Sequence, residues 1–260
     1  MELTLYQVDA FARQVFKGNP AAICPLDTWL PDSTMQAIAA ENNLSETAFF
    51  VRENNGYHIR WFTPRYEVNL CGHATLAAAY VIFHLLKTES EKIHFESRSG
   101  ELIVSLDENQ IVMDFPAIAM QPAELPQHII KALGNEPVAI WKAEDYLLLY
   151  DRQQDIVSLS PDFGGLKALD CRGIIITAVG EDCDFVSRFF APRHGIDEDP
   201  VTGSAHCMLA PLWSEKLGKK RMTAKQLSKR GGELVCEVKG DRVIIAGEAT
   251  LYMQGKIFID

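Results

Sequence analysis

The segment Arg60–Arg65 reads RWFTPR, and the segment Arg188–Arg193, 128 positions later, reads RFFAPR. Both segments place an arginine, two aromatic residues and a proline in the same order. Internal repeats define the architecture of a chain, so they are considered before any single motif. The recurrence predicts two structurally related halves.

Three shorter matches occur in the same order along the chain. They are Pro31-Asp32 with Pro161-Asp162 and Thr47-Ala48 with Thr177-Ala178, both displaced by 130 positions, and Cys71–Ala74 with Thr202–Ala205, displaced by 131. Small differences between the displacements are expected of insertions in loops. Four ordered matches favour duplication over chance.

Each half is expected to contain a short helix, two strands, a loop and a second helix. Met35, Ile38 and Ala39 have the spacing of one helix face. Residues 72–87 are apolar on nearly all sides, which is typical of an enclosed helix. Alternating runs predict further strands at 101–106, 111–115, 243–246 and 256–259. We therefore expect an α+β fold of two pseudo-symmetric lobes, each a β-barrel-like sheet around a central helix.

The boundary between the lobes is expected near Pro116–Pro126, where three prolines follow a predicted strand. This places the N-terminal lobe at residues 1–115 and the C-terminal lobe at 116–250. The last strand, 251–260, is a candidate to complete the N-terminal lobe.

The composition of the chain excludes several classes of protein. It has 260 residues, 47% of them hydrophobic, and a formal net charge of −10. An acidic protein repels a phosphate backbone, so nucleic acid is not expected as a partner. The basic run Lys216–Arg230 is interpreted as a solvated helix and loop. No stretch is apolar enough to span a bilayer, and the N-terminus lacks the layout of a signal peptide, so a cytoplasmic location is expected.

The six cysteines and most of the histidines show no spacing typical of a metal site. We expect the cysteines to be reduced and mostly buried, and no metal to be bound. A structural role is expected for the histidines at positions 58, 84, 94, 128, 194 and 206.

Glu46 is the leading candidate for chemistry. Period-2 alternation places it on the same strand face as Leu44, Ala48 and Phe50. A carboxylate among apolar side chains is costly unless it is paired or used, and such surroundings raise its pKa toward the range of a general base. The duplicated half has Ile176 at the position that the Thr-Ala match makes equivalent. The alternative is a glutamate at a strand end that faces water or pairs with an arginine, Arg52 or Arg60.

The two glycine turns, Gly72 and Gly203, each begin a predicted helix. Backbone N–H groups at a helix N-terminus form an anion site, so the pair could bind a carboxylate. His73, Asp199 and Ser204 lie at the same turns and could contact a substrate. The alternatives are a glycine needed only for a tight turn, and Asp and Ser side chains that cap helices or form Asx turns.

Cys71 precedes Gly72 at a helix N-terminus, a setting that lowers the pKa of a thiol. Two such thiols, one in each half, would suit a two-base racemase. The equivalent residue in the second half is Thr202, which cannot act as that base. A two-thiol mechanism is therefore disfavoured.

Five segments together resemble the PhzF family of phenazine biosynthesis-like isomerases. They are Gly18–Ala22, Leu44–Phe49, Trp61–Pro64, Leu70–Thr75 and Asp199–Ala205. The resemblance implies a diaminopimelate-epimerase-like fold with the active site between two lobes. It also implies an activity similar to isomerisation of trans-2,3-dihydro-3-hydroxyanthranilate, in which a proton moves along a conjugated system.

The resemblance also implies roles for individual residues. It assigns catalysis to Glu46, with support from His73, Asp199 and Ser204, and substrate binding to Gly72, Thr202 and Gly203. It implies no cofactor and a homodimer. The physiological substrate does not follow from it.

The leading hypothesis is a cofactor-free isomerase of a small carboxylate-bearing molecule, with Glu46 as the acid/base. One alternative is an amino-acid racemase or epimerase. The other is a protein that binds a small molecule on the same fold without turnover.

Overall fold

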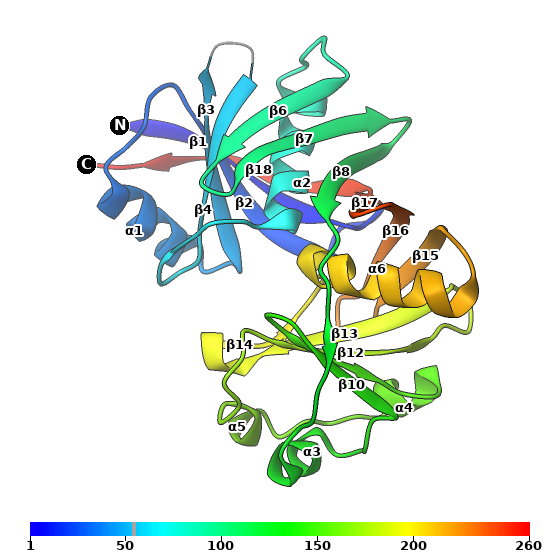
Figure 1. Cartoon of the computed structure of the whole chain (residues 1–260). Helices are drawn as coiled ribbons and strands as arrows, with labels where there is room; N and C mark the ends of the chain where they lie inside the picture. Colours follow the sequence, from blue (N-terminus) through cyan, green and yellow to red (C-terminus); the bar gives the residue numbers. More distant parts are fainter. Residues whose placement is uncertain (54–55) are drawn as a thin grey trace. The chain divides into compact units, whose positions relative to one another are not determined.

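The structure is a computed structural model that describes residues 1–53 and 56–260 (Figure 1). The chain divides into two compact units, residues 1–115 with 245–260 and residues 116–244. Residues 245–250 thus group with the first unit, which corrects the expected limit of the C-terminal lobe. The reason is that β18 (Ala249–Phe258) pairs with β1 (Glu2–Ala10) from its first residue onward.

The first unit is a sheet with two helical segments. Its strands after β1 are β2 (Asn19–Leu26), β3 (Glu46–Glu53), β4 (Gly56–Phe62), β5 (Glu67–Val68), β6 (Lys92–Ser97), β7 (Gly100–Asp107) and β8 (Gln110–Pro116). Its helices are α1 (Asp32–Asn42) and α2 (Gly72–Tyr80), which continues as a π-helix over Val81–Leu85. The N- and C-terminal strands, β1 and β18, lie side by side (Figure 1).

The second unit contains more short helices. Its strands are β9 (Gln121–Pro122), β10 (Ala139–Lys142), β11 (Tyr146–Leu149), β12 (Ile174–Val179), β13 (Phe185–Ala191), β14 (Ile196–Asp199), β15 (Arg221–Gln226) and β16 (Gly232–Lys239). The division between the units falls within β17 (Arg242–Gly247), whose residues from Ile245 onward belong to the first unit. Its helices are α3 (Gln127–Leu133), α4 (Gln153–Val157), α5 (Phe163–Leu166), the 3-10 turn Pro192–His194 and α6 (Gly203–Leu217).

Both units follow one pairing pattern, as the repeat predicts. In the first, β2 is parallel to β3, β3 antiparallel to β4, and β4 parallel to β6. In the second, β11, β12, β13 and β15 pair in the same order and directions. In each unit a short strand, β5 or β14, pairs with the third strand of this set and precedes the long helix. The α+β fold of two related sheet-and-helix lobes is confirmed.

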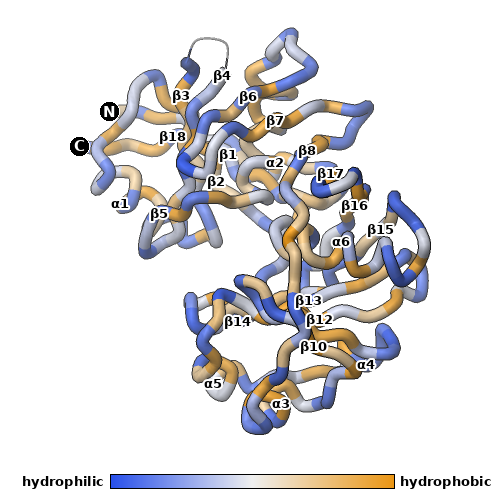
Figure 2. The backbone as a smooth tube through the Cα atoms, in the orientation of Figure 1, coloured by the Kyte–Doolittle hydropathy of each residue, from blue (hydrophilic) through white to orange (hydrophobic). Residues whose placement is uncertain are grey.

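The long helix of each unit packs against its sheet. All residues of α2 from His73 to Ala79 are buried, and α2 contacts β1, β2, β3 and β18. The predicted enclosed helix is therefore present, although its last turn is a π-helix. Helix α6 contacts β15 and β16. Hydrophilic residues gather at the turns between the elements (Figure 2).

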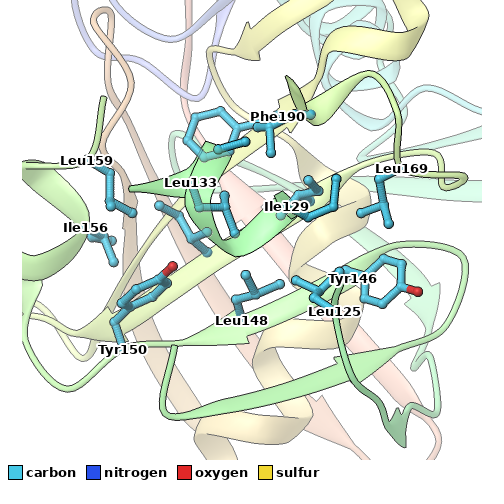
Figure 3. Packing of buried hydrophobic residues seen from close by; sticks show 14 of the residues in the cluster. Leu125, Ile129, Leu133, Tyr146, Leu148, Tyr150, Ile156, Leu159, Leu169 and Phe190 are labelled. Atoms are coloured by element: carbon cyan, nitrogen blue, oxygen red, sulfur yellow. The ribbon is translucent and has the colours of Figure 1, made fainter. Parts of the chain in front are cut away.

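The second unit has a further apolar core beneath its short helices. Ile129 and Leu133 of α3 pack in one cluster with Leu148 of β11 and Phe190 of β13 (Figure 3). All four side chains are fully buried. Burial of a side chain of this size contributes about 1.5–3 kcal/mol, so this cluster holds the sheet of the unit in place independently of α6.

The arginine of the repeated segment makes the same interactions in both units. Arg60 forms two hydrogen bonds with Glu67, of 2.7 and 2.8 Å, and its Cζ lies 5.2 Å from the ring centre of Phe62. Arg188 forms two with Glu198, of 2.7 and 3.1 Å, and its Cζ lies 5.0 Å from the ring centre of Phe190. Paired hydrogen bonds over an aromatic face fix a guanidinium. The repeat therefore preserves a structural clamp that joins β4 to β5 and β13 to β14.

The strand register corrects one equivalence drawn from the repeat. Arg60 pairs with Phe49, whereas Arg188 pairs with Ile176. Ile176 thus corresponds to Phe49 and not to Glu46, and the Thr-Ala match does not follow the register. Counting back three residues makes Gly173 the counterpart of Glu46. A Cβ at Gly173 would lie 2.2 Å from Cζ of Phe189, so the second unit has no room for a side chain there.

A second correction concerns the basic run Lys216–Arg230. It includes the strand β15, in which Met222, Ala224 and Gln226 are buried, so it is not a solvated helix and loop. The alternation of buried and exposed residues along this stretch is the physical reason. Among the described residues, no helix has both the length and the apolar character needed to cross a membrane.

Candidate active site

Glu46 and His73 are brought together at one end of the first unit. Glu46 is the first residue of β3, and its neighbours in the strand are buried on both faces. His73 is the second residue of α2, where the helix begins against β2 and β3. The distance from His73 Nε2 to Glu46 Oε2 is 3.2 Å, and the two side chains are only 6% and 14% exposed. The expected alternative, in which Glu46 pairs with Arg60, is not seen, because Arg60 is engaged by Glu67 and Asp32.

Asn19 determines which nitrogen of His73 carries the hydrogen. This residue, fully buried at the start of β2, places its Nδ2 3.2 Å from His73 Nδ1. An amide nitrogen only donates, so Nδ1 must accept. In the neutral ring the hydrogen is therefore on Nε2, the nitrogen nearer to Glu46. The contact of 3.2 Å between Nε2 and Glu46 Oε2 does not have the geometry of a hydrogen bond.

Burial keeps the imidazole of His73 neutral. Removal from water lowers its pKa to about 3, because the charged form loses its hydration. The contact with Glu46 is therefore a close approach of a neutral imidazole to a carboxyl group, not an ion pair at neutral pH. A neutral N–H donor can hold a carboxylate in place without neutralising it.

Cys71 is a further neighbour of His73. It precedes α2, is buried, and its Sγ lies 3.5 Å from His73 Nδ1. Its backbone carbonyl accepts a hydrogen bond of 2.6 Å from the hydroxyl of Thr75, which stabilises the first turn of α2. The thiol thus lies on the side of the ring opposite to Glu46. None of the six cysteines, all within the described ranges, forms a disulfide.

Glu46, Cys71 and His73 each offer one ligand atom for a metal, all within 4.8 Å of one another. The thiol contacts Nδ1 of the ring and the carboxylate contacts Nε2. A metal held by one ring nitrogen at about 2.0–2.1 Å would be remote from the group on the other side. The arrangement suits hydrogen bonding and would have to change to hold an ion.

The second unit contains a separate polar cluster before α6. Asp199, the last residue of β14, accepts a hydrogen bond from the hydroxyl of Thr202. Gln226 accepts from the Thr202 backbone N–H at 2.9 Å and donates to the Asp199 backbone oxygen at 2.8 Å. The ring Nδ1 of His206 lies 2.9 Å from the Thr202 carbonyl oxygen, and burial lowers its pKa to about 4. Asp199 is therefore fixed by a buried network.

The side chain of the N-cap residue of α6 does not accept a hydrogen bond from the backbone N–H groups at the helix N-terminus. Thr202 is the N-cap, but its hydroxyl donates to Asp199, and no side-chain cap forms. Ser204 does not cap the helix either, because its Oγ accepts a hydrogen bond of 3.2 Å from Arg172 Nη1. The capping alternative is therefore not seen for Ser204.

Sequence reasoning found some residues of these clusters and missed others. It named Glu46, Cys71, His73, Asp199 and Ser204. Gln226, Arg172 and Asp145, which accepts hydrogen bonds from Arg172, belong to no motif and lie far from the glycine turns in the sequence. Asn19 belongs to the segment Gly18–Ala22, so its motif was visible but its contact with His73 was not.

The chain matches the family model described as "Phenazine biosynthesis-like protein" over residues 8–255. It is 52% identical over 259 residues to an uncharacterized isomerase of Pseudomonas aeruginosa, and the match covers 100% of both chains. The crystal structure of a phenazine biosynthesis protein of the PhzF family from Enterococcus faecalis superposes with a TM-score of 0.97 at 46% identity, covering 100% of both chains. A probable proline racemase from Agrobacterium radiobacter has a TM-score of 0.66 at 10% identity, covering 99% of this chain and 93% of that one. The last likeness shows the fold alone.

Proposed function

Because the chain belongs to the family of phenazine biosynthesis-like proteins, we propose that it is an isomerase that moves a proton within a small, conjugated, carboxylate-bearing substrate. Relatives over the full length of the chain carry the name isomerase. The observation that carries the proposal is the contact of Glu46 with a neutral, buried His73.

Glu46 acts as the base in this proposal. Its carboxylate removes a proton from a carbon that conjugation has made acidic, and the electron pair moves into the conjugated system. The same carboxyl group then returns the proton to another carbon. The substrate gains and loses nothing overall, so Glu46 ends each turnover as it began, and no co-reactant is needed.

His73 is proposed to support Glu46 as a hydrogen-bond donor, which requires a better-aligned contact than the present one of 3.2 Å. Asn19 occupies Nδ1, so the ring hydrogen is on Nε2, the nitrogen nearer to the carboxylate. A neutral donor stabilises the carboxylate less than a full positive charge would, so the carboxylate stays basic enough to accept a proton. Protonation of His73 itself is not needed at any step.

The residues of the second cluster are proposed to bind the same substrate. Asp199 would accept a hydrogen bond from its amino or hydroxyl group. Ser204 and the backbone N–H groups at Gly203 and Gly72 would bind its carboxylate, as helix N-termini do for anions. Thr202 uses its hydroxyl and N–H internally, so it would act by orienting Asp199. The homodimer and the cytoplasmic location stay predictions.

A racemase that uses Cys71 is the alternative enzyme. The register of β5 and β14 makes Thr202 the counterpart of Cys71, as the repeat indicated. A hydroxyl with its ordinary, very high pKa is a poor second base. A protein that binds a carboxylate without turnover is the other alternative, and the following test separates it.

The first test measures proton exchange in heavy water with trans-2,3-dihydro-3-hydroxyanthranilate. A thermal-shift screen of small carboxylates follows, and each compound that binds is tested in the same exchange assay. The wild type should isomerise a substrate and incorporate deuterium, and Glu46→Gln should do neither. Glu53→Gln, at the exposed end of the same strand, is the matched control and should be active. Carboxylates that bind but exchange no hydrogen would favour the binding protein.

A further inference from the structure

Arg172 lies two residues before the start of β12, and its side chain reaches the first turn of α6. Its Nη1 donates to Ser204 Oγ at 3.2 Å. Its Nε donates to Asp145 Oδ1 at 2.9 Å, and its Nη2 donates to Asp145 Oδ2. The guanidinium thus links a carboxylate from the turn between β10 and β11 to a hydroxyl at the helix N-terminus.

The direction of the hydrogen bond to Ser204 follows from chemistry. A guanidinium has five N–H donors and no acceptor. Ser204 Oγ must therefore accept from Arg172, and its own hydroxyl hydrogen is left to donate in a different direction. Ser204 is partly exposed, so this hydrogen can reach a ligand.

Arg172 is held firmly enough to impose this direction. Asp145 is fully buried, and its two oxygens bind two nitrogens of the guanidinium, the geometry of a strong pair. Burial by itself would lower the pKa of Arg172, but the hydrogen bonds and the charge of Asp145 outweigh it and raise the pKa. The Cζ of Arg172 also lies 5.8 Å from the ring centre of Phe189.

The feature near Ser204 that favours an anion as the ligand is the N-terminus of the 15-residue helix α6, which carries partial positive charge. The side-chain charges do not add to it, because Asp145 and Glu144, 3.6 Å from Arg172, together outweigh the charge of the guanidinium. A donor hydroxyl at that end matches a carboxylate, which only accepts.

We propose that Arg172, fixed by Asp145, is a positioning residue that commits the Ser204 hydroxyl to donate to the substrate carboxylate. The proposal rests on the function proposed above, because it presumes that Ser204 contacts the substrate. It assigns the carboxylate end of the substrate to this cluster and leaves the proton transfer to Glu46.

The test measures binding with two probes that differ in one group. Anthranilate carries a carboxylate on the ring skeleton of the expected substrate, and 2-aminobenzamide replaces the carboxylate by a neutral amide. The wild type should bind anthranilate more tightly. Ser204→Ala and Arg172→Gln should each weaken anthranilate binding by roughly tenfold or more and change 2-aminobenzamide binding little. Arg193→Gln removes an exposed Arg–Asp pair of the same unit and should leave both affinities unchanged.

The double variant decides whether Arg172 acts through Ser204. If it does, Arg172→Gln should add nothing to the loss already caused by Ser204→Ala. Arg172→Lys keeps a donor but loses the paired hydrogen bonds with Asp145, so it should restore only part of the affinity. In turnover the loss should appear in KM more than in kcat.

Additive losses in the double variant would overturn the proposal in favour of direct contact between Arg172 and the ligand. Equal binding of the two probes by the wild type, or binding of neither, would overturn it as well. If the coupling of Arg172 with Ser204 is found but Glu46→Gln still exchanges protons, the positioning role stands and the proposed catalytic mechanism fails.

Discussion

His73 Nε2 lies 3.2 Å from Glu46 Oε2, while the Asn19 side-chain amide occupies the opposite ring nitrogen, Nδ1. These three residues come from β3, α2 and β2, which are neighbours in the first unit. The amide leaves the ring hydrogen on the nitrogen nearer to the carboxylate, and burial keeps the imidazole neutral. In the proposed mechanism neither His73 nor Asn19 needs to exchange a proton.

Replacement of Glu46 should reduce turnover without reducing the stability of the fold. Glu46→Gln cannot accept a proton, so turnover should fall by ~10²–10⁴. The amide has nearly the same size and removes a charge from a mostly buried position, so the melting temperature should stay the same or rise. Thermal denaturation together with deuterium exchange checks both parts. A large loss of stability would mean that the lost activity reports unfolding.

Cys71→Ala should keep most of the activity. The thiol contacts Nδ1 of His73, which Asn19 already occupies, and it has Thr202 rather than a second thiol as its counterpart. The cost should be limited to packing at the start of α2. Turnover of the same substrate is the measurement. An inactive Cys71→Ala beside an active Glu46→Gln would replace the glutamate mechanism by a thiol mechanism.

Asn19→Asp should reverse the tautomer of His73. A carboxylate accepts, so Nδ1 would take the hydrogen and Nε2 would present a lone pair to Glu46. Turnover should fall by roughly 10²-fold, the scale on which a mispositioned acid/base pair loses its contribution. Nitrogen chemical shifts of the ring report the tautomer directly. As a control, Asn42→Asp changes the hydrogen bond of 3.1 Å from Asn42 Nδ2 to Thr47 Oγ1. This hydrogen bond does not involve the imidazole, so the tautomer should be unchanged.

The stability of the protein should decrease in mild acid because of its buried histidines. Burial lowers the pKa of His73 to about 3 and of His206 to about 4, while in the unfolded chain both have values near 6.5. Below pH 6.5 the unfolded chain therefore binds more protons than the native one. Each histidine should lower the free energy of unfolding by roughly 1 kcal/mol per pH unit between 6.5 and its native value.

Denaturant unfolding over pH 4–7 measures this effect. His73→Gln should flatten the dependence, because the replaced side chain no longer takes up a proton. His94→Gln, which removes an exposed histidine paired with Glu101, should leave the slope in place. An identical slope in His73→Gln and wild type would show that His73 does not contribute.

A carboxylate ligand should bind at the glycine turns rather than at the basic residues. Titration with anthranilate should shift the backbone amides of Gly72 and Gly203, because helix N-termini bind anions through these groups. The amides of Lys216–Arg230 should not move, since that run carries side-chain charge but includes the strand β15. Shifts confined to the basic run would contradict the proposed site.

The sequence by itself determined the repeat and the elements that follow from it. RWFTPR and RFFAPR, with three shorter matches in the same order, predict two related halves because ordered repeats indicate duplication. The enclosed helix after Gly72 and the strand at Glu46 follow from apolar patterns that are local along the chain. These features need no knowledge of distant contacts.

Only the tertiary structure decided the partners of each functional group. Strand pairing set Gly173, not Ile176, as the counterpart of Glu46, because register depends on hydrogen bonds between strands and not on sequence spacing. Asn19 reaches His73 across 54 positions, and Arg172 reaches Asp145 and Ser204 across 27 and 32. A buried polar group needs a partner, but any strand or turn that the fold brings near can supply it, so the pairing exists only once the chain has folded.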